Sequence, residues 1–464
     1  MDAMKSVFER MHAQSRREPE TSYAVRRRRL AALEALLCEN VEALAAAIST
    51  DFGGRSTHET RLLEVFPGRE GLAHAQRHLR GWMRTQGRSV SLWFQPGRAE
   101  VRYQPLGVVG IIVPWNYPLY LTIGPLTAAL AAGNRALVKM SEFTPVTATL
   151  LAELIARYFD PDEVAIVQGE AEVAQAFSQL PFDHLFFTGS TAVGHHVMRA
   201  AAANLTPVTL ELGGKSPAII APAYPLDKAA DRILVGKCLN AGQTCIAPDY
   251  VLLPEGQEQA FIAAARTVVA GCYPQMTTTP DYSAIVNARH YERLVSYLDD
   301  AVVKGATVVP LSNASADASR RHFPPVALLG ARDDMRVMQE EIFGPILPIL
   351  PYRDIDAAIA HVNQRPRPLA LYVFDEMPER VDRVLAQTVA GGVTVNDTIL
   401  HIAQDSLPFG GVGPSGMGCY HGREGFLTFS HAKAVFRQSR LSGIGLFKPP
   451  YGKRFEWLIG WLLR

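Results

Sequence analysis

The sequence predicts an α/β protein built around parallel sheets, and three observations lead to this fold class. Between residues 108 and 220, five short apolar runs alternate with segments whose apolar residues have helical spacing. A second alternating set follows from about 215 to 400. The chain has 464 residues, which is too long for one ordinary hydrophobic core, so we expect two or three domains.

The N-terminal part of the chain has a different pattern. Apolar residues recur at spacings of three and four through 22–86, which predicts helices, and the run Arg26–Arg29 is expected on the solvated face of one of them. The stretch 89–107 then changes to short β-rich runs around a Pro96-Gly97 turn. This change predicts a β-hairpin that protrudes from the fold.

The first predicted sheet contains a candidate nucleotide site. Its strands are the runs VVGIIV, RALVKM, EVAIV, DHLFF and TPVTLEL, and such sheets bind nucleotides at the carboxyl ends of their strands. The string FTGSTAVG at 187–194 follows one strand and opens a helix whose terminal amides can face phosphates. A plain helix cap by Ser190 or Thr191 explains the same residues, so both interpretations stay open.

The charges of the chain nearly cancel, since 46 Lys and Arg stand against 45 Asp and Glu and leave a net charge of +1. We therefore expect no nucleic-acid partner. The five cysteines form no metal-ligand spacing, so no metal site is expected, and their small number suits a reducing cytoplasm. The first 20 residues lack the apolar core of a secretory signal, and no apolar run is long enough to span a bilayer.

The C-terminal string FEWLIGWLLR predicts a short amphipathic helix, because Phe455, Leu458, Ile459 and Leu462 fall on one face at helical spacing. The favoured interpretation is a terminal helix that packs on its own body or on a second subunit. Contact of this helix with a membrane surface is the alternative.

Cys245 is the candidate reactive cysteine. It lies in NAGQTCIAPD, a turn rich in Gly, Gln and Thr, where a thiolate can be exposed and activated. Cys38 and Cys272 have apolar neighbours and are expected to be ordinary core residues. On local composition alone, a buried, inert Cys245 is the favoured interpretation.

Five motifs stand in order along the chain: PWNYP at 114–118, ELGGKSP at 211–217, GQTC at 242–245, EEIFGP at 340–345 and LPFGGVGPSGMG at 407–418. Together they resemble the aldehyde dehydrogenase superfamily, from about residue 20 to 435. The string from Gly391 to Gly422 and the tail through KPPYGKRF resemble the shorter, dimeric class 3 branch, which includes bacterial coniferyl aldehyde dehydrogenases.

The resemblance implies the aldehyde dehydrogenase fold, with a Rossmann-like NAD-binding domain, an α/β catalytic domain, a small β oligomerisation element and a C-terminal tail. The expected bounds are, in that order, 1–88 with 108–211, then 212–405, then 89–107 with 406–435, and 436–464. It also implies a homodimer with two-fold symmetry, paired through the oligomerisation element.

The resemblance implies a reaction that converts an aldehyde to a carboxylic acid. Cys245 matches the nucleophile, which forms a thiohemiacetal and then a thioester. The side-chain amide of Asn116 and the backbone N–H of Cys245 match the donors to the oxyanion. Glu211 matches the general base that activates the hydrolytic water, and its presence argues against acyl transfer to coenzyme A. A thiol hydrolase would require a histidine partner for Cys245, and a retired, non-enzymatic relative would not retain these residues.

The cofactor implied by the resemblance is NAD, with NADP possible. Glu142 is expected to accept a hydrogen bond from the ribose 2′-hydroxyl and to repel a 2′-phosphate, and Lys139 is expected to offset part of that repulsion. Met140 stands where many relatives have proline, which leaves the shape of this loop open. The matched cofactor positions are Lys139, Glu142, Gly189, Ser190, Gly194, Glu341 and Phe343.

The substrate is the least determined part of the interpretation. Trp115, Tyr117 and Tyr120 are expected either to line an aromatic pocket or to serve packing. His401 resembles a class 3 histidine near the substrate entrance, and a structural role for it is the favoured interpretation. The resemblance favours aromatic aldehydes such as coniferaldehyde, and medium or long-chain aliphatic aldehydes are the alternative.

Overall fold

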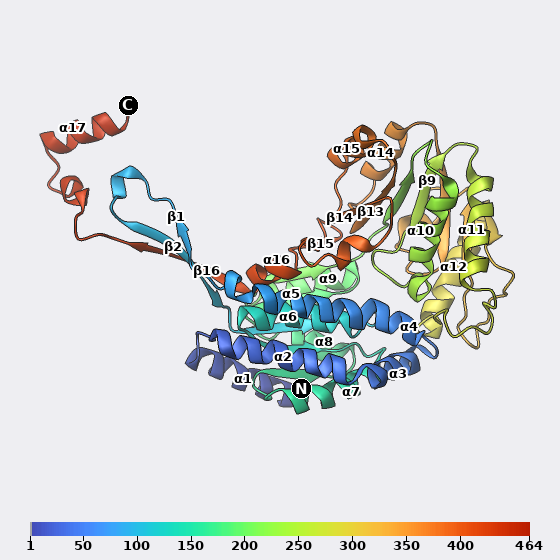
Figure 1. The fold of residues 1–464 in the computed structure, drawn as a ribbon, viewed down its shortest axis with the longest axis horizontal. Coiled ribbons are helices and arrows are strands. Elements are labelled where there is room, and N and C mark those ends of the chain that lie inside the picture. The colour runs from blue at the N-terminus through green and yellow to red at the C-terminus, as the bar shows by residue number, and fades with distance from the viewer. Residues whose placement is uncertain (1) are drawn as a thin grey trace.

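The computed structural model describes residues 2–464, and the strands in this range form three sheets (Figure 1). In the two larger sheets, neighbouring strands are parallel except for one edge strand in each. The predicted α/β class with parallel sheets is therefore confirmed.

The first sheet is built outward from a central strand. Its strands are β3 (Val108–Ile112), β4 (Arg135–Lys139), β5 (Val164–Val167), β6 (His184–Thr188), β7 (Val208–Glu211) and β15 (Gly416–Met417), in the spatial order β15-β7-β6-β3-β4-β5. The five strands predicted from apolar runs all form. The chain adds β4 and β5 on one side of β3 and then β6 and β7 on the other, so the strand order reverses between β3 and β6.

Helices cover both faces of the first sheet. They are α1 (Asp2–Arg17), α2 (Tyr23–Glu39), α3 (Val41–Phe52), α4 (Thr57–Thr60), η1 (Arg61–Val65), α5 (Phe66–Trp82), α6 (Tyr120–Ala132), α7 (Pro145–Tyr158), α8 (Ala171–Ser178), α9 (Thr191–Ala202) and α16 (Gly422–Thr428). Alternate residues of β3 belong to different apolar clusters, because Val109 and Ile111 pack with α2, α6 and α7 while Val108 and Ile112 pack with α1 and α9.

The expectation of a solvated Arg26–Arg29 run is wrong for two of its members. Arg26 and Arg29 are 2% and 3% exposed. Arg26 donates to the carbonyl of Ala131 at 3.0 Å, and Arg29 pairs with Glu163 at 3.1 Å. One face of α2 packs against the first sheet and its helices. The arginines on that face are therefore buried, and their charged groups are paired with fixed hydrogen-bond acceptors.

The second sheet forms a separate α/β layer. Its strands are β8 (Pro217–Ile220), β9 (Tyr250–Pro254), β10 (Thr307–Pro310), β11 (Val326–Leu329), β12 (Ile346–Tyr352), β13 (Ala370–Phe374) and β14 (Gly392–Val395), in the order β10-β11-β12-β9-β8-β13-β14. The accompanying helices are α10 (Leu226–Cys238), η3 (Leu239–Gly242), α11 (Glu258–Cys272), α12 (Ala288–Val303), α13 (Arg336–Gln339), α14 (Ile355–Asn363), α15 (Pro378–Gln387) and η4 (Leu400–Ala403). Chain 212 to 216 connects the two larger sheets.

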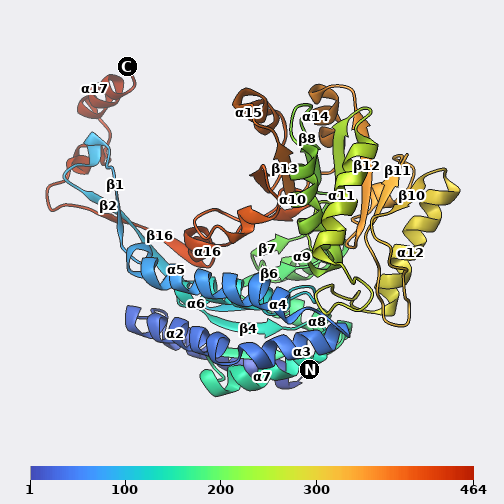
Figure 2. The same ribbon diagram turned by 45° about the vertical axis from the view of Figure 1, so that its right-hand side comes forward.

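The third sheet is antiparallel and projects from the body, as Figures 1 and 2 both show. It consists of β1 (Gln86–Arg88), β2 (Arg98–Pro105) and β16 (Ser430–Arg437), with η2 (Leu92–Phe94) in the turn, so the predicted hairpin is confirmed. Most of 406–429 lies elsewhere, since β15 pairs with β7 and α16 packs on α5 and α6.

The tail contains η5 (Gly443–Phe447) and α17 (Lys453–Leu462), which lies beside the hairpin turn and away from the body (Figure 1). The expectation that it packs on its own body is wrong, because no residue of α17 is buried within this chain and Trp457 is 71% exposed. Its contact with the hairpin is a T-shaped pair of Trp461 and Trp93 at 5.3 Å. No helix within 2–464 is long and apolar enough to cross a membrane.

Candidate active site

Cys245 follows a strained turn at the end of α10. Three consecutive residues of this turn have positive φ, Asn240 at 50°, Ala241 at 51° and Gly242 at 74°. Positive φ is unfavourable for residues other than glycine and persists only where surrounding contacts hold it, often at functional sites. A side chain at Gly242 would collide with the carbonyl of Gly344, so the turn needs glycine there.

A buried amide holds this turn. The Nε2 atom of Gln243 donates to the carbonyls of Asn240 at 2.9 Å and Ala284 at 3.0 Å, and its Oε1 accepts from the N–H of Val286 at 2.9 Å. The N–H of Asn240 donates to the Glu59 carboxyl at 3.1 Å. Such buried polar networks are rigid, because each broken bond would leave a group without a partner.

Asn116 lies against the same turn. Its Nδ2 donates to the carbonyl of Gln243 at 3.1 Å, and its own carbonyl accepts from Arg55 at 2.9 Å. Arg55 forms an ion pair with Glu64 at 2.9 Å, and both side chains are fully buried. Sequence analysis missed Arg55 and Glu64, because nothing in their local pattern distinguishes them from surface charges.

Two acidic side chains stand near the Cys245 thiol. Burial raises the pKa of this thiol, and the negative charges of Glu341 and Glu211 raise it further. Burial also raises the pKa of Glu211 well above its usual value, and neither of its oxygens has a hydrogen-bond partner within residues 2–464. Burial raises the pKa of Glu341 to about 8, aided by the charge of Asp249. Burial therefore shifts the pKa values of the thiol and of both carboxyls in the same direction, upward.

A cavity of about 800 Å³ opens at the carboxyl ends of β3, β4 and β6. We call it the strand-end cavity, and it lies where the strand order reverses. Its lining includes Trp115, Lys139, Glu142, Phe143, Gly189, Ser190, Val193, His196, Arg289, His290 and Arg293. Lys139 is almost fully buried, with its ammonium donating to the carbonyl of Met140 at 2.7 Å.

Most sequence-predicted cofactor residues of the first domain line this cavity, namely Lys139, Glu142, Gly189 and Ser190. Ser190 also caps α9, since its hydroxyl accepts from the N–H of Val193 at 3.4 Å. Gly194 does not line it. It lies on the buried face of α9, where a side chain would meet Leu212 at 2.7 Å.

The segment Glu341–Phe343 is clamped from two sides. Arg293 donates to the carbonyls of Glu341 at 3.4 Å, Ile342 at 2.8 Å and Phe343 at 3.3 Å. Asp249 accepts from the N–H of Ile342 at 2.9 Å and pairs with Lys215. Phe343 has φ 48°, so the clamp holds a strained residue. No sequence motif identified Arg293 as a candidate site residue.

The three substrate candidates lie in different places. Trp115 lines the strand-end cavity, with its ring 5.3 Å from that of Phe343. Tyr117 is buried and shares a 2.7 Å hydrogen bond with Thr244, next to Cys245. His401 shares a 2.9 Å hydrogen bond with Thr394 and stacks on Phe409 at 5.9 Å. Burial lowers the pKa of His401 to about 4, so this ring is neutral at pH 7.

The expectation of core positions for Cys38 and Cys272 is wrong, because both are exposed. They lie on the outward faces of α2 and α11, and local composition does not reveal which face of a helix a residue occupies. All five cysteines are free, and within residues 2–464 no group of His, Cys, Asp or Glu could hold a metal ion.

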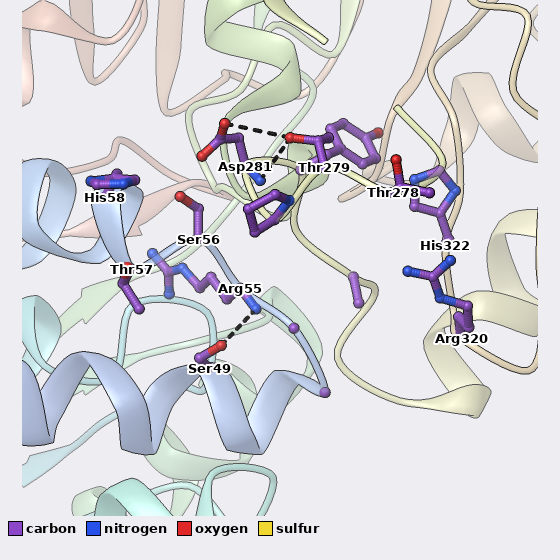
Figure 3. A pocket seen from close by; sticks show the side chains of 15 residues that line it. Ser49, Arg55, Ser56, Thr57, His58, Thr278, Thr279, Asp281, Arg320 and His322 are labelled. Atoms are coloured by element: carbon purple, nitrogen blue, oxygen red, sulfur yellow. Dashed lines mark hydrogen bonds between the residues drawn. The ribbon is translucent and has the colours of Figure 1, made fainter. Parts of the chain in front are cut away.

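A second cavity, of about 380 Å³, lies between the chain after α3 and loops of the second domain (Figure 3). Its labelled lining includes Arg55, His58, Asp281, Arg320 and His322. None of the sequence-predicted site residues lines it. Arg55 connects its wall to Asn116, so this cavity lies behind the Cys245 turn.

The comparisons with known proteins agree with this geometry. The model of the aldehyde dehydrogenase family matches residues 2–435. A Pseudomonas aeruginosa protein named "probable coniferyl aldehyde dehydrogenase" is 55% identical over 459 residues, which cover 99% of this chain and 96% of that protein. The substrate-bound state of Staphylococcus aureus AldH superposes with a TM-score of 0.94 at 38% identity and covers all of both chains. The NAD+ complex of a Bacillus cereus aldehyde dehydrogenase has a TM-score of 0.84 at 27% identity, covering 95% of this chain and 89% of that one.

Proposed function

The chain belongs to the aldehyde dehydrogenase family, and on this premise we propose that it oxidises an aldehyde to the carboxylic acid through a thioester on Cys245. The observation that carries the proposal is the cluster at the thiol. Cys245 follows a strained turn bonded to Asn116, and it lies near two carboxyls whose pKa values are raised. A thiol beside such groups can lose its proton to a neighbour as it attacks.

The first step is attack of the Cys245 sulfur on the aldehyde carbon. The thiol proton passes to a neighbouring carboxylate, and the carbonyl π electrons move to oxygen. Asn116 has two N–H donors, of which one bonds to the Gln243 carbonyl. Its other N–H, together with the backbone N–H of Cys245, stabilises the oxyanion of the thiohemiacetal.

The strand-end cavity fits a nicotinamide dinucleotide. Its volume suits a cofactor, it lies at the reversal point of a parallel sheet, and the N-terminus of α9 faces it with Ser190 and Val193. Lys139 and Glu142 would hold the adenosine ribose, and Glu341 and Phe343 the nicotinamide end. Such a cofactor would supply the hydride acceptor that this oxidation requires.

The last step is hydrolysis of the thioester. Glu211 in its ionised form takes a proton from water, the oxygen attacks the acyl carbon, and the Cys245 thiolate leaves. The raised pKa of Glu211 makes its carboxylate a stronger base than an exposed one. The balanced reaction consumes aldehyde, water and oxidised cofactor and yields acid, reduced cofactor and a proton.

An assay of aldehyde-dependent formation of reduced cofactor by the purified chain tests the proposal. We expect turnover by the natural sequence and none by Cys245→Ala. Turnover by this variant at the natural rate would contradict the proposed nucleophile.

We propose NAD as the preferred cofactor. Glu142 lines the strand-end cavity, and its carboxylate would accept a hydrogen bond from a ribose hydroxyl but repel a 2′-phosphate. Lys139, Arg289 and Arg293 line the same cavity and offset part of this repulsion, so NADP is expected to react more slowly rather than not at all.

We propose an aromatic aldehyde such as coniferaldehyde as substrate. The support is the name of the 55% identical relative and a group of rings near the thiol. The ring of Phe409 lies 6.0 Å from that of Tyr420, and the pKa of Tyr420 is raised by burial and further by nearby negative charge, including that of Cys245. Equal turnover of aliphatic and aromatic aldehydes would contradict this choice.

We also propose a cytoplasmic homodimer. The third sheet and the tail expose large apolar side chains, including Leu92, Trp93, Leu441 and Trp457 at 78%, 54%, 75% and 71%. Monomers rarely expose so much apolar surface in one region. The five free cysteines suit a reducing compartment. Light scattering should give the dimer mass, and a monomer mass would contradict the pairing.

A further inference from the structure

A narrow niche lies between α5, the start of α6 and the chain around Asp405 and His421. Much of its wall is made of small residues that leave space, including Gly68, Gly71, Ala75, Gly124, Ala128 and Gly422. The volume of the niche is about 30 Å³, which is room for about one water. The niche therefore admits a polar substituent of a ligand and excludes a whole ring.

The polar groups of the niche are arranged around this small space. Tyr120 and His421 line it, and the Tyr120 hydroxyl lies 3.2 Å from Nε2 of His421. His421 is 6% exposed, and its Nδ1 has no hydrogen-bond partner within residues 2–464. Where the tyrosine donates to Nε2, the hydrogen of the neutral imidazole is on Nδ1. The ring then offers a buried donor that no group among the described residues uses.

Asp405 supplies an acceptor at the mouth of the niche. It is half-buried, and a side chain at Gly71 would lie 3.2 Å from its Oδ1. Burial and the charge of Glu70 raise the pKa of Asp405 to about 6, so the carboxylate is ionised at neutral pH. The wall of the niche thus contains a histidine with an unpartnered ring nitrogen and a charged acceptor.

The niche belongs to the same region as the Cys245 thiol. Tyr117 shares its hydroxyl bond with Thr244, and Tyr120 follows one turn later at the start of α6. Burial raises the pKa of the Tyr420 phenol, and the negative charges of Tyr120, Glu211 and Cys245 raise it further; the Tyr420 ring lies 4.4 Å from that of His421. Aromatic rings therefore extend from beside the thiol to the niche.

We propose that this niche, formed by Asp405, His421 and Tyr120, recognises the phenolic hydroxyl of a para-hydroxylated aromatic aldehyde. Asp405 accepts the phenol O–H, and Nδ1 of His421 donates to the phenol oxygen. A conjugated aromatic aldehyde is rigid, so its hydroxyl stands at a fixed distance from the carbon that Cys245 attacks. The inference rests on the proposed function and names the feature by which its substrate is selected.

The test compares three aldehydes in the natural protein: coniferaldehyde, its 4-O-methyl ether and unsubstituted cinnamaldehyde. We expect kcat/KM to be highest for the free phenol, because the ether cannot donate to Asp405 and its methyl group exceeds the niche. Equal values for the phenol and the ether would overturn the inference. Absence of turnover with every aldehyde would instead contradict the proposed function.

Two variants sharpen this test. Asp405→Asn should lower the ratio of kcat/KM for coniferaldehyde over cinnamaldehyde by about tenfold, as expected for loss of a hydrogen bond to a charged group. Glu70→Gln is the matched control, since it removes a nearby carboxylate that does not line the niche, and it should not lower the ratio. An unchanged ratio in Asp405→Asn, or an equal fall in both variants, would overturn the role of Asp405.

Discussion

Two parts of the site are built in opposite ways. The turn before Cys245 is held by Gln243, which donates to the carbonyl of Asn240, and by Glu59, which accepts from the N–H of Asn240. Arg55 in turn donates to the carbonyl of Asn116, so the frame of the site has many internal hydrogen bonds. The proposed base lacks them, since both oxygens of Glu211 have no hydrogen-bond partner within residues 2–464. The protein thus uses hydrogen bonds to fix geometry and leaves the proposed acid-base group free for substrate and water.

Removal of the thiol is the sharpest way to separate the two parts. Cys245→Ala should abolish activity, a loss of more than about a thousandfold, while the free energy of unfolding changes by less than about 1 kcal/mol. Steady-state assays and denaturant unfolding measure the two effects. Cys238→Ala is the control and should remain active, because Cys238 is a buried core residue of α10. Inactivity of Cys238→Ala alone would reverse the assignment.

Damage to the hydrogen-bonded frame should instead lower the free energy of unfolding. Arg55→Met leaves Glu64 buried without its partner and should cost about 3–5 kcal/mol of unfolding free energy. Arg61→Met removes an exposed ion pair with Glu42 and should cost less than about 1 kcal/mol. Denaturant unfolding of both variants measures the difference. Equal costs would show that the buried pair does not support the frame.

The Arg293 clamp connects the frame to the proposed cofactor cavity. Arg293→Met removes three donors to the segment Glu341–Phe343, and we expect kcat to fall by about tenfold with a larger isotope effect from deuterated aldehyde. Arg289→Met is the control, because Arg289 lines the same cavity and is exposed. If both variants raise only the KM for the cofactor, Arg293 attracts the cofactor through its charge and does not position the segment Glu341–Phe343.

The smallest effect is expected at Glu142. Glu142→Gln should raise kcat/KM with NADP by a few fold and lower it with NAD, because the change removes a repulsive charge and weakens a hydrogen bond. Kinetic comparison of both cofactors measures the preference. No gain with NADP would show that another residue of the strand-end cavity sets the choice.

The sequence predicted what depends on local pattern. Apolar runs located the strands β3 to β7, and the motifs singled out Cys245, Glu211 and Asn116, which the structure brings into one region. The prediction of burial failed where a side chain's surroundings come from residues far away in the sequence. Arg26 and Arg29 are buried against the first sheet and its helices, and Cys38 is exposed to solvent. Arg55 contacts Asn116 across 61 positions, a pairing that no local pattern contains.

The central claim is that Cys245 carries an acyl group that Glu211 helps water to remove. Intact-mass measurement of Glu211→Gln after mixing with aldehyde and NAD tests it most directly. We predict one equivalent of reduced cofactor and a persistent acyl mass on the peptide that contains Cys245. Sustained turnover with no adduct, or an adduct on another cysteine, would contradict the account.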